Sequence, residues 1–339
     1  MDWPRTALTE LLGIRFPIVQ APMANGPSTP ELAAAVSAAG ALGSIAGAPL
    51  APEALRAEIR AVRSLTGRPF AVNLFAPLPP AAPAPGAVEA VHAFLAPHRE
   101  RLGLPVPAPP PARAWGFADQ LGVVLEEEVP VLSFTFGIPP LAAVRDAVVL
   151  GTATTPEEAV ELESAGIDVV VAQGAEAGGH RGTFIGSFEA GLVGSAVLVP
   201  QVVAAVSVPV LAAGGIVDGR GIAAALVLGA EGVQLGTAFL YAEESGASKA
   251  WRRALRELPT AVSRHYSGRP GRAARTPFLA ALEAIEPVPF PLNSALLADL
   301  RDHDGYGFYL GGEGAPLARE LPAAELVATL AAETEAALR

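Results

Sequence analysis

The sequence contains no cysteine and only one lysine, and its 34 acidic residues outnumber its 23 basic ones. The absence of cysteine excludes disulfides, thiolate metal sites, iron–sulfur clusters and cysteine nucleophiles. The single lysine, Lys249, lies in a polar run typical of an exposed helix, which disfavours a catalytic role. The net charge of −11 argues against a nucleic-acid partner, because proteins that bind nucleic acids present a basic face to the phosphates.

Long apolar runs are also missing, although 51% of the residues are hydrophobic. Gly, Pro, Asp or Arg interrupts the apolar stretches 204–216 and 221–228 before they reach the roughly 18 residues that a membrane span needs. The first residues lack the basic and then apolar pattern of a signal peptide. The sequence therefore predicts a cytoplasmic protein with no membrane partner.

Short apolar runs alternate along the chain with alanine-rich stretches of helical character. Because the runs are continuously apolar, they are typical of parallel strands that are buried on both faces. The predicted strands are residues 17–21, 42–46, 70–75, 131–136, 148–152, 169–173, 208–213 and 232–236. Eight such strands in 339 residues favour a closed (β/α)8 TIM barrel of the α/β class over the alternative, an open doubly wound sheet.

Two parts of the chain depart from this alternation. Stretches rich in Pro and Ala at 77–86 and 104–113 flank a predicted helix at 87–101, and the short connection 137–148 leaves room for a helix of only about two turns. After the eighth strand the chain continues to residue 339. We expect residues 1–240 to form the barrel, with its final helix contributed by the C-terminal part, and residues 241–339 to form a helical cap over the substrate.

Glycine-rich loops follow the last two predicted strands. The seventh ends in Gly214-Gly215 and the eighth in Gly236-Thr237. Barrels commonly bind phosphate at these two loops, since glycine lets backbone N–H groups approach the phosphate oxygens, and the Thr237 hydroxyl can add a donor. Two adjacent loops of this kind predict a phosphate site. The alternative is that they are tight turns that only close the barrel.

The loop after the sixth strand contains Gln173, His180 and Arg181 among several glycines. Histidine is the usual side chain for proton transfer near neutral pH, so His180 is the candidate catalytic residue; the alternative is a structural histidine that caps the loop. Gln173 can bond the edge of a heterocycle, and Arg181 can bind a substrate carboxylate or form a surface ion pair. No second ligand stands at metal-binding spacing, so no metal site is expected.

Strands one, three and four also end in candidate residues. A turn follows Gln20, and Asn73 would direct an amide with both a donor and an acceptor into the barrel mouth, or else bond the neighbouring backbone. Around 131–137, either Ser133 and Thr135 or the two adjacent phenylalanines face inward, and the alternation alone does not decide which pair does.

Taken together and in order, these motifs resemble the nitronate monooxygenase family, formerly called 2-nitropropane dioxygenases. The motifs are Pro17-Ile-Val-Gln-Ala-Pro-Met23, Ala71-Val-Asn-Leu-Phe75, Leu132-Ser-Phe-Thr-Phe-Gly137, Gly151-Thr-Ala-Thr-Thr155, the loop 173–182, Ala212-Ala-Gly-Gly-Ile216 with Asp218-Gly-Arg-Gly221, and Gln234-Leu-Gly-Thr237. The resemblance implies FMN as cofactor and His180 as the active-site base or anion partner. The flavin contacts that it implies are Pro22, Met23, Ala24, Asn73, Gln173, Gly178, Gly214, Gly215, Gln234, Gly236 and Thr237.

The resemblance also implies a reaction. An alkyl nitronate, or a nitroalkane, would be oxidised with O2 to a carbonyl compound and nitrite. The enzyme would be a monomer or a homodimer. One alternative is an FMN-dependent NAD(P)H reductase on the same barrel, either an enoyl-acyl-carrier-protein reductase or a quinone reductase. A second alternative is a non-catalytic FMN-binding protein, which the presence of His180 disfavours.

Overall fold

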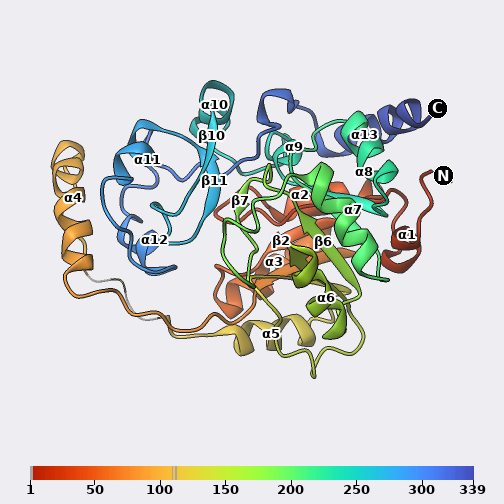
Figure 1. The fold of residues 1–339 in the computed structure, drawn as a ribbon, viewed down its shortest axis with the longest axis horizontal. Helices are drawn as coiled ribbons and strands as arrows, with labels where there is room; N and C mark the ends of the chain where they lie inside the picture. Colours follow the sequence, from red (N-terminus) through yellow and green to blue (C-terminus); the bar gives the residue numbers. More distant parts are fainter. Residues whose placement is uncertain (1–2, 109, 111–112) are drawn as a thin grey trace.

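The computed structural model describes residues 3–108, 110 and 113–339, and eight parallel strands form its centre (Figure 1). The strands are β1 (Ile18–Gln20), β2 (Gly43–Ala46), β3 (Phe70–Phe75), β4 (Val131–Thr135), β5 (Val148–Ala153), β6 (Val169–Gln173), β8 (Val210–Ala213) and β9 (Gly232–Leu235). They pair in the order β1-β9-β8-β6-β5-β4-β3-β2. The Gln20 amide donates to the Leu42 carbonyl at 2.8 Å, which brings the first strand back to the second. The predicted (β/α)8 barrel is confirmed.

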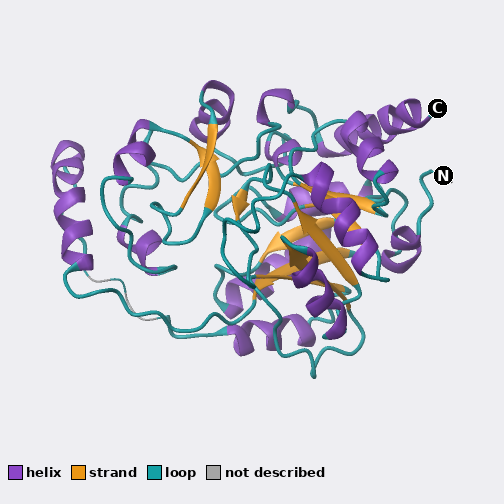
Figure 2. Cartoon of the chain, in the orientation of Figure 1, coloured by secondary structure: helices purple, strands orange, loops and turns teal. Residues whose placement is uncertain are grey.

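Helices surround this sheet on its outer side (Figure 2). They are α2 (Pro30–Ala38), α3 (Pro52–Leu65), α5 (Phe117–Glu126), α6 (Pro156–Ser164), α7 (Ser195–Ala205), α8 (Gly219–Val227) and α13 (Ala323–Leu338). Two of them begin at threonine N-cap residues: the Thr29 and Thr155 side chains accept hydrogen bonds from backbone N–H groups of the first turn, and a proline follows each at the first helical position. The C-terminal helix α13 contacts α8 and α2, so it occupies the place after β9.

The barrel has an inner and an outer apolar layer. Inside, side chains such as Val19, Val131 and Val171 meet, and Leu8 and Leu12 of α1 (Ala7–Leu12) pack against this layer. The outer layer lies between the strands and the surrounding helices. This double burial explains why the strands are apolar without interruption.

The short helix predicted between β4 and β5 is wrong. Residues 136–147 form turns and irregular chain. Pro139 and Pro140 lie in this connection, where they lack backbone N–H donors and push the residue before each of them away from helical dihedral angles.

The C-terminal segment contains strands as well as helices. After α9 (Thr237–Leu240) and α10 (Lys249–Glu257) come β10 (Thr260–Ser263), β11 (Gly271–Ala274), α11 (Pro277–Leu282), α12 (Leu292–Leu296) and the 3-10 helix η1 (Ala315–Leu317). The strands form an antiparallel sheet in the order β10-β11-β7, and β7 (Gly179–His180) comes from the loop after β6. The sheet therefore joins the cap directly to the loop that carries the candidate histidine.

Helix α4 (Ala87–Leu102) belongs to the core of the cap, although it is inserted after β3. Val91 and Leu95 pack in one apolar cluster with cap residues such as Tyr266 and Phe278, and in Figure 1 α4 lies on the side of α11 and α12, far from the barrel strands. The buried Arg99 guanidinium donates to Asp299 at 2.7 Å. In the described ranges, no helix is long and apolar enough to cross a membrane.

Candidate active site

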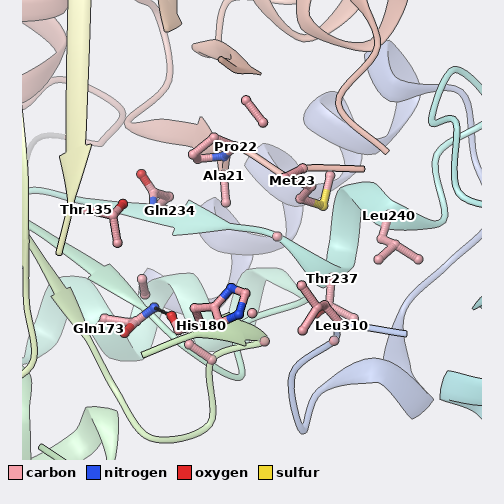
Figure 3. Close-up of a pocket in the computed structure, with 18 of the residues that line it drawn as sticks. Ala21, Pro22, Met23, Thr135, Gln173, His180, Gln234, Thr237, Leu240 and Leu310 are labelled. Carbon is pink, nitrogen blue, oxygen red and sulfur yellow. Dashed lines mark hydrogen bonds between the residues drawn. The ribbon is translucent and has the colours of Figure 1, made fainter. Parts of the chain in front are cut away.

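A cavity lies at the carboxyl ends of the barrel strands, beneath the cap (Figure 3). The candidate catalytic residue and all the flavin contacts predicted from the sequence line it. These residues are Pro22, Met23, Ala24, Asn73, Gln173, Gly178, His180, Gly214, Gly215, Gln234, Gly236 and Thr237. In Figure 3, His180 and Gln173 lie together on one side, and Pro22 and Met23 lie across from them. The structure thus brings residues from the ends of five strands, β1, β3, β6, β8 and β9, to one place.

One side of the cavity, here called the glycine wall, consists of Gly214, Gly215, Gly236 and Thr237. Gly214 and Gly215 have φ of +121° and +74°, which L side chains rarely adopt. Within the described part of the chain, the backbone N–H groups of Gly215 and Thr237 have no acceptor. The wall therefore presents N–H donors and a hydroxyl but no fixed charge.

A third loop, which the sequence reasoning missed, completes this wall from the cap. The Gly312 amide donates to Thr237 Oγ1 at 2.9 Å, which leaves the Thr237 hydroxyl proton free to be donated to a ligand. A Cβ on Gly314 would stand 2.5 Å from the Gly215 carbonyl oxygen, so the two backbones are in direct contact. The only signal in the sequence was the glycine-rich run at 311–314.

Two amide side chains, those of Asn73 and Gln173, line the cavity at the ends of their strands. Asn73 Nδ2 donates to Ser133 Oγ at 3.0 Å and lies 3.3 Å from Thr135 Oγ1, so Ser133 and Thr135 are the inward pair of β4. Gln173 accepts the Gly182 amide at 2.9 Å and donates to the His180 carbonyl at 3.1 Å. In this structure Gln173 holds the histidine loop in place.

The turn after β1 is held by side chains that sequence reasoning did not single out. Ser28 Oγ accepts the Met23 amide at 2.8 Å and the Gln20 side-chain amide at 2.9 Å. Gln20 also accepts the Ser44 amide at 2.7 Å. The Met23 N–H is therefore engaged within the protein, and Met23 offers its side chain and not its amide to the cavity.

A second group of residues, here called the histidine wall, comprises His180 and Phe136, which line the cavity, and Ser267, Arg269 and Phe290, which contact them. His180 Nε2 lies 2.8 Å from Ser267 Oγ, and the Ser267 hydroxyl donates to the Arg269 carbonyl at 2.9 Å. Since that hydroxyl has one proton, Nε2 must be the donor to Oγ. The network thus assigns the proton of neutral His180 to Nε2 and leaves a lone pair on Nδ1.

Aromatic rings surround the imidazole. Its centroid lies 5.3 Å from that of Phe290, 5.8 Å from that of Phe308 and 6.1 Å from that of Phe136. Burial, and next the nearby Arg269 guanidinium, lower the pKa of His180 from 6.5 to about 4. His180 is therefore neutral at pH 7 and able to accept a proton.

The two arginines of this region serve the fold. Arg181 is fully buried and donates to the carbonyls of Gly174 and Gly191 at 2.6 and 2.9 Å, so it makes no surface ion pair and does not line the cavity. Arg269 donates to the Thr183 carbonyl at 2.6 Å. Its guanidinium carbon lies 3.9 Å from the centroid of the Phe136 ring.

Phe136 reaches the cavity through an unusual backbone conformation. Alternation along β4 places Phe134 in the outer layer of the core and would send Phe136 to the same side. Phe136 instead has φ of +79°, and its ring lines the cavity. A bulky residue in this region is strained, and such strain occurs preferentially at functional sites.

Comparisons with known proteins agree with this geometry. The model of a family described as nitronate monooxygenase matches residues 5–333. A nitronate monooxygenase from Pseudomonas aeruginosa is 47% identical, covering 96% of this chain and 98% of the relative. The nitroalkane oxidase of Streptomyces ansochromogenes superposes with a TM-score of 0.90 at 43% identity, covering 98% and 99% of the two chains. FabK from Thermotoga maritima is less similar, with a TM-score of 0.75 at 32% identity over 98% and 96%.

Proposed function

This chain belongs to the nitronate monooxygenase family and is an oxidoreductase of nitronates or nitroalkanes, and we propose that it works with FMN and O2. The observation that carries the proposal is that two unlike walls border one cavity. N–H donors gather on the glycine wall, and a neutral imidazole stands on the histidine wall. The N–H donors suit a flavin phosphate, and the neutral imidazole suits a substrate that loses a proton from carbon.

The glycine wall fits the phosphate of FMN. The free N–H groups of Gly215 and Thr237, with the Thr237 hydroxyl, would donate to its oxygens. The Gln234 and Asn73 amides and the backbone around Pro22 would border the neutral ring system. When bound, FMN supplies the electron acceptor that oxidises the substrate and passes the electrons on to O2.

His180 would act on the substrate through Nδ1. The edge of the ring that bears Nε2 and Cδ2 faces the cap, where Nε2 meets Ser267 and Cδ2 lies near Gly271. Nδ1 is then the atom that takes the α-proton of a nitroalkane, and the resulting imidazolium stands beside the nitronate anion. A nitronate supplied as such needs no proton removal, so it depends less on this residue.

The C-terminal segment would cover the reacting groups. Residues 241–339 supply Ser267 and Phe290 at the histidine and the loop 311–314 at the glycine wall. Exclusion of water by such a cover strengthens electrostatic contacts inside the site.

A product assay tests the proposed function. The purified protein is mixed with ethylnitronate in air, and O2 uptake and nitrite are followed with and without NADH or NADPH. We expect flavin absorption bands and nitrite release that needs no pyridine nucleotide. Bands that bleach only with NADH or NADPH, without nitrite, would favour a reductase, and a colourless protein would contradict the flavin assignment.

A further inference from the structure

A carboxylate is buried outside the cavity, against the segment that follows the candidate histidine in the chain. Glu158, in the first turn of α6, has no exposed surface and does not line the cavity. One of its oxygens accepts the Thr154 amide at 2.6 Å and the Thr154 hydroxyl at 2.8 Å. The other accepts the amides of Phe184 and Ile185, the latter at 2.9 Å. Because all four partners are donors, the group is held as an ionised carboxylate.

This carboxylate does more than begin its own helix. Thr155 is the N-cap of α6, and its side chain accepts the Glu158 amide. A glutamate at this position commonly turns back to the amide of the N-cap residue. The Glu158 side chain bonds residues 183–185, here called the anchored segment, and Thr154, whose hydroxyl lies 2.8 Å from that of Thr183. It therefore ties the end of β5 to the loop after β6.

The cap holds the anchored segment from its other side. Arg269 Nη2 donates to the Thr183 carbonyl at 2.6 Å. The Arg269 carbonyl accepts the Ser267 hydroxyl, and the oxygen of that hydroxyl accepts Nε2–H of His180. A continuous set of contacts thus leads from Glu158 through the anchored segment and Arg269 to the imidazole.

The charge of Glu158 also supports the guanidinium in this set. Burial lowers the pKa of Arg269 to about 10, and the negative charge of Glu158 opposes that shift. The carboxylate therefore helps to keep Arg269 charged, and a charged guanidinium is a stronger donor to the Thr183 carbonyl than a neutral group would be. Removal of the carboxylate would weaken the anchored segment at its amides and at this carbonyl.

We propose that Glu158 is a positioning residue for proton transfer, which fixes the anchored segment and, through Arg269 and Ser267, the orientation of the His180 ring. The inference rests on the proposed function, because the α-proton of the substrate passes to that ring. Glu158 itself contacts neither substrate nor flavin in this account. A small displacement of the ring slows proton transfer, whereas the glycine wall, built at other strand ends, keeps its flavin.

The variant Glu158→Gln tests this role. Its side chain has the same length but turns an NH2 group towards two of the four donors, so the anchored segment should loosen. We expect kcat with nitroethane to fall about tenfold, and turnover of ethylnitronate to change less than about twofold, at unchanged flavin content. The deuterium isotope effect with nitroethane deuterated at the α-carbon should be at least as large as in the parent protein, because removal of that proton becomes slower.

A second variant and a matched control accompany this measurement. Glu158→Asp keeps the charge but withdraws the carboxylate from the anchored segment, so it should give a smaller loss in the same direction, and it carries the test if Glu158→Gln does not fold. Glu163, on the same helix, accepts the amides of Ser207 and Val208 at 2.7 and 3.2 Å, away from the cavity. Glu163→Gln should leave both rates unchanged.

Hydrogen exchange provides a measurement that does not depend on turnover. In the flavin-loaded protein, Glu158→Gln should speed amide exchange in the anchored segment about tenfold, and Glu163→Gln should speed it only at the two amides bonded to Glu163. Unchanged exchange in the anchored segment of Glu158→Gln, or an equal loss of turnover with both substrates, would overturn the proposal. If the parent protein oxidises neither substrate but exchange follows this pattern, the proposed function fails while the anchoring by Glu158 stands.

Discussion

The glycine wall and the histidine wall border one cavity, yet they are assembled in different ways. Three of the four residues of the glycine wall are glycines, and all four stand at the ends of two adjacent strands. The histidine wall joins the loop after β6, the end of β4 and two separate stretches of the cap. The four residues of the first wall belong to two short motifs and offer mainly backbone N–H groups, although the cap loop 311–314 completes that wall. The second wall depends on side chains brought together over long separations.

This difference teaches which part of a function a sequence can reveal. The backbone N–H groups of a glycine-rich loop can bind a phosphate wherever that loop follows the right strand of a barrel. A short motif is therefore enough to predict the phosphate site. The properties of His180, in contrast, depend on Ser267 and Arg269, which lie more than 80 positions away along the chain. A substitution in the glycine wall should therefore affect flavin binding, and one in the histidine wall should affect proton transfer.

The largest effect is expected at the glycine wall. Gly215→Val should abolish flavin retention, because its φ of +74° is strained for valine and a Cβ would lie 3.2 Å from Glu176 Cβ, so the loop predicted to bind the phosphate would have to shift. The ratio of visible to ultraviolet absorbance of the purified protein measures this. Gly86→Val is the matched control: Gly86 has φ of +75° with open space around it, far from the cavity, and should keep its flavin. A fully loaded Gly215→Val protein would show that the phosphate lies elsewhere.

A smaller effect, confined to the other wall, is expected for Ser267→Ala. Loss of the acceptor for Nε2–H lets His180 populate the wrong tautomer, so kcat with nitroethane should fall about tenfold while flavin content is kept. Turnover of ethylnitronate should change much less. Ser263→Ala removes a comparable buried hydroxyl that bonds His265 outside the cavity, and it should leave both rates unchanged. Equal losses with both substrates in Ser267→Ala would contradict a positioning role.

The smallest effect is a displacement of the pH profile. Neutral His180 is the active base, and its lowered pKa keeps it neutral down to about 4. For nitroethane below the pKa of the substrate, kcat/KM should stay constant to about pH 5, where an ordinary imidazole would already have lost most of its activity. Arg269→Gln should move the midpoint upward, because it removes the second cause of the shift. A midpoint at or above 6.5 in the parent protein would contradict the lowered pKa of His180.

The barrel and the residues that line the cavity were predictable, because both follow from local features of the sequence. Continuous apolar runs indicated all eight strands, and strand ends of a parallel barrel meet at one face, so the predicted site residues converge there. The missing helix between β4 and β5 was also readable in principle, since Pro139 and Pro140 oppose it. The helix was predicted from periodicity and from the length of the connection, without regard to these two prolines.

Other features of the site have no local signature. The left-handed conformation of Phe136 reverses the side of the strand that alternation assigns to it, and tertiary packing against Arg269 and Phe290 accompanies that conformation. The pairing of β7 with β11 places His180 opposite Gly271, and neither segment is long enough to predict a strand. These contacts depend on how the cap meets the barrel, which no single segment determines.

The separate roles of the two walls, flavin binding and proton transfer, are tested most directly by His180→Ala, assayed with nitroethane and with ethylnitronate. The account predicts an unchanged flavin spectrum, a loss of nitroethane turnover on the order of 100-fold or more, and a loss of less than about tenfold with ethylnitronate. Undiminished nitroethane turnover, or an equal loss with both substrates, would contradict the assignment of His180 as the proton acceptor.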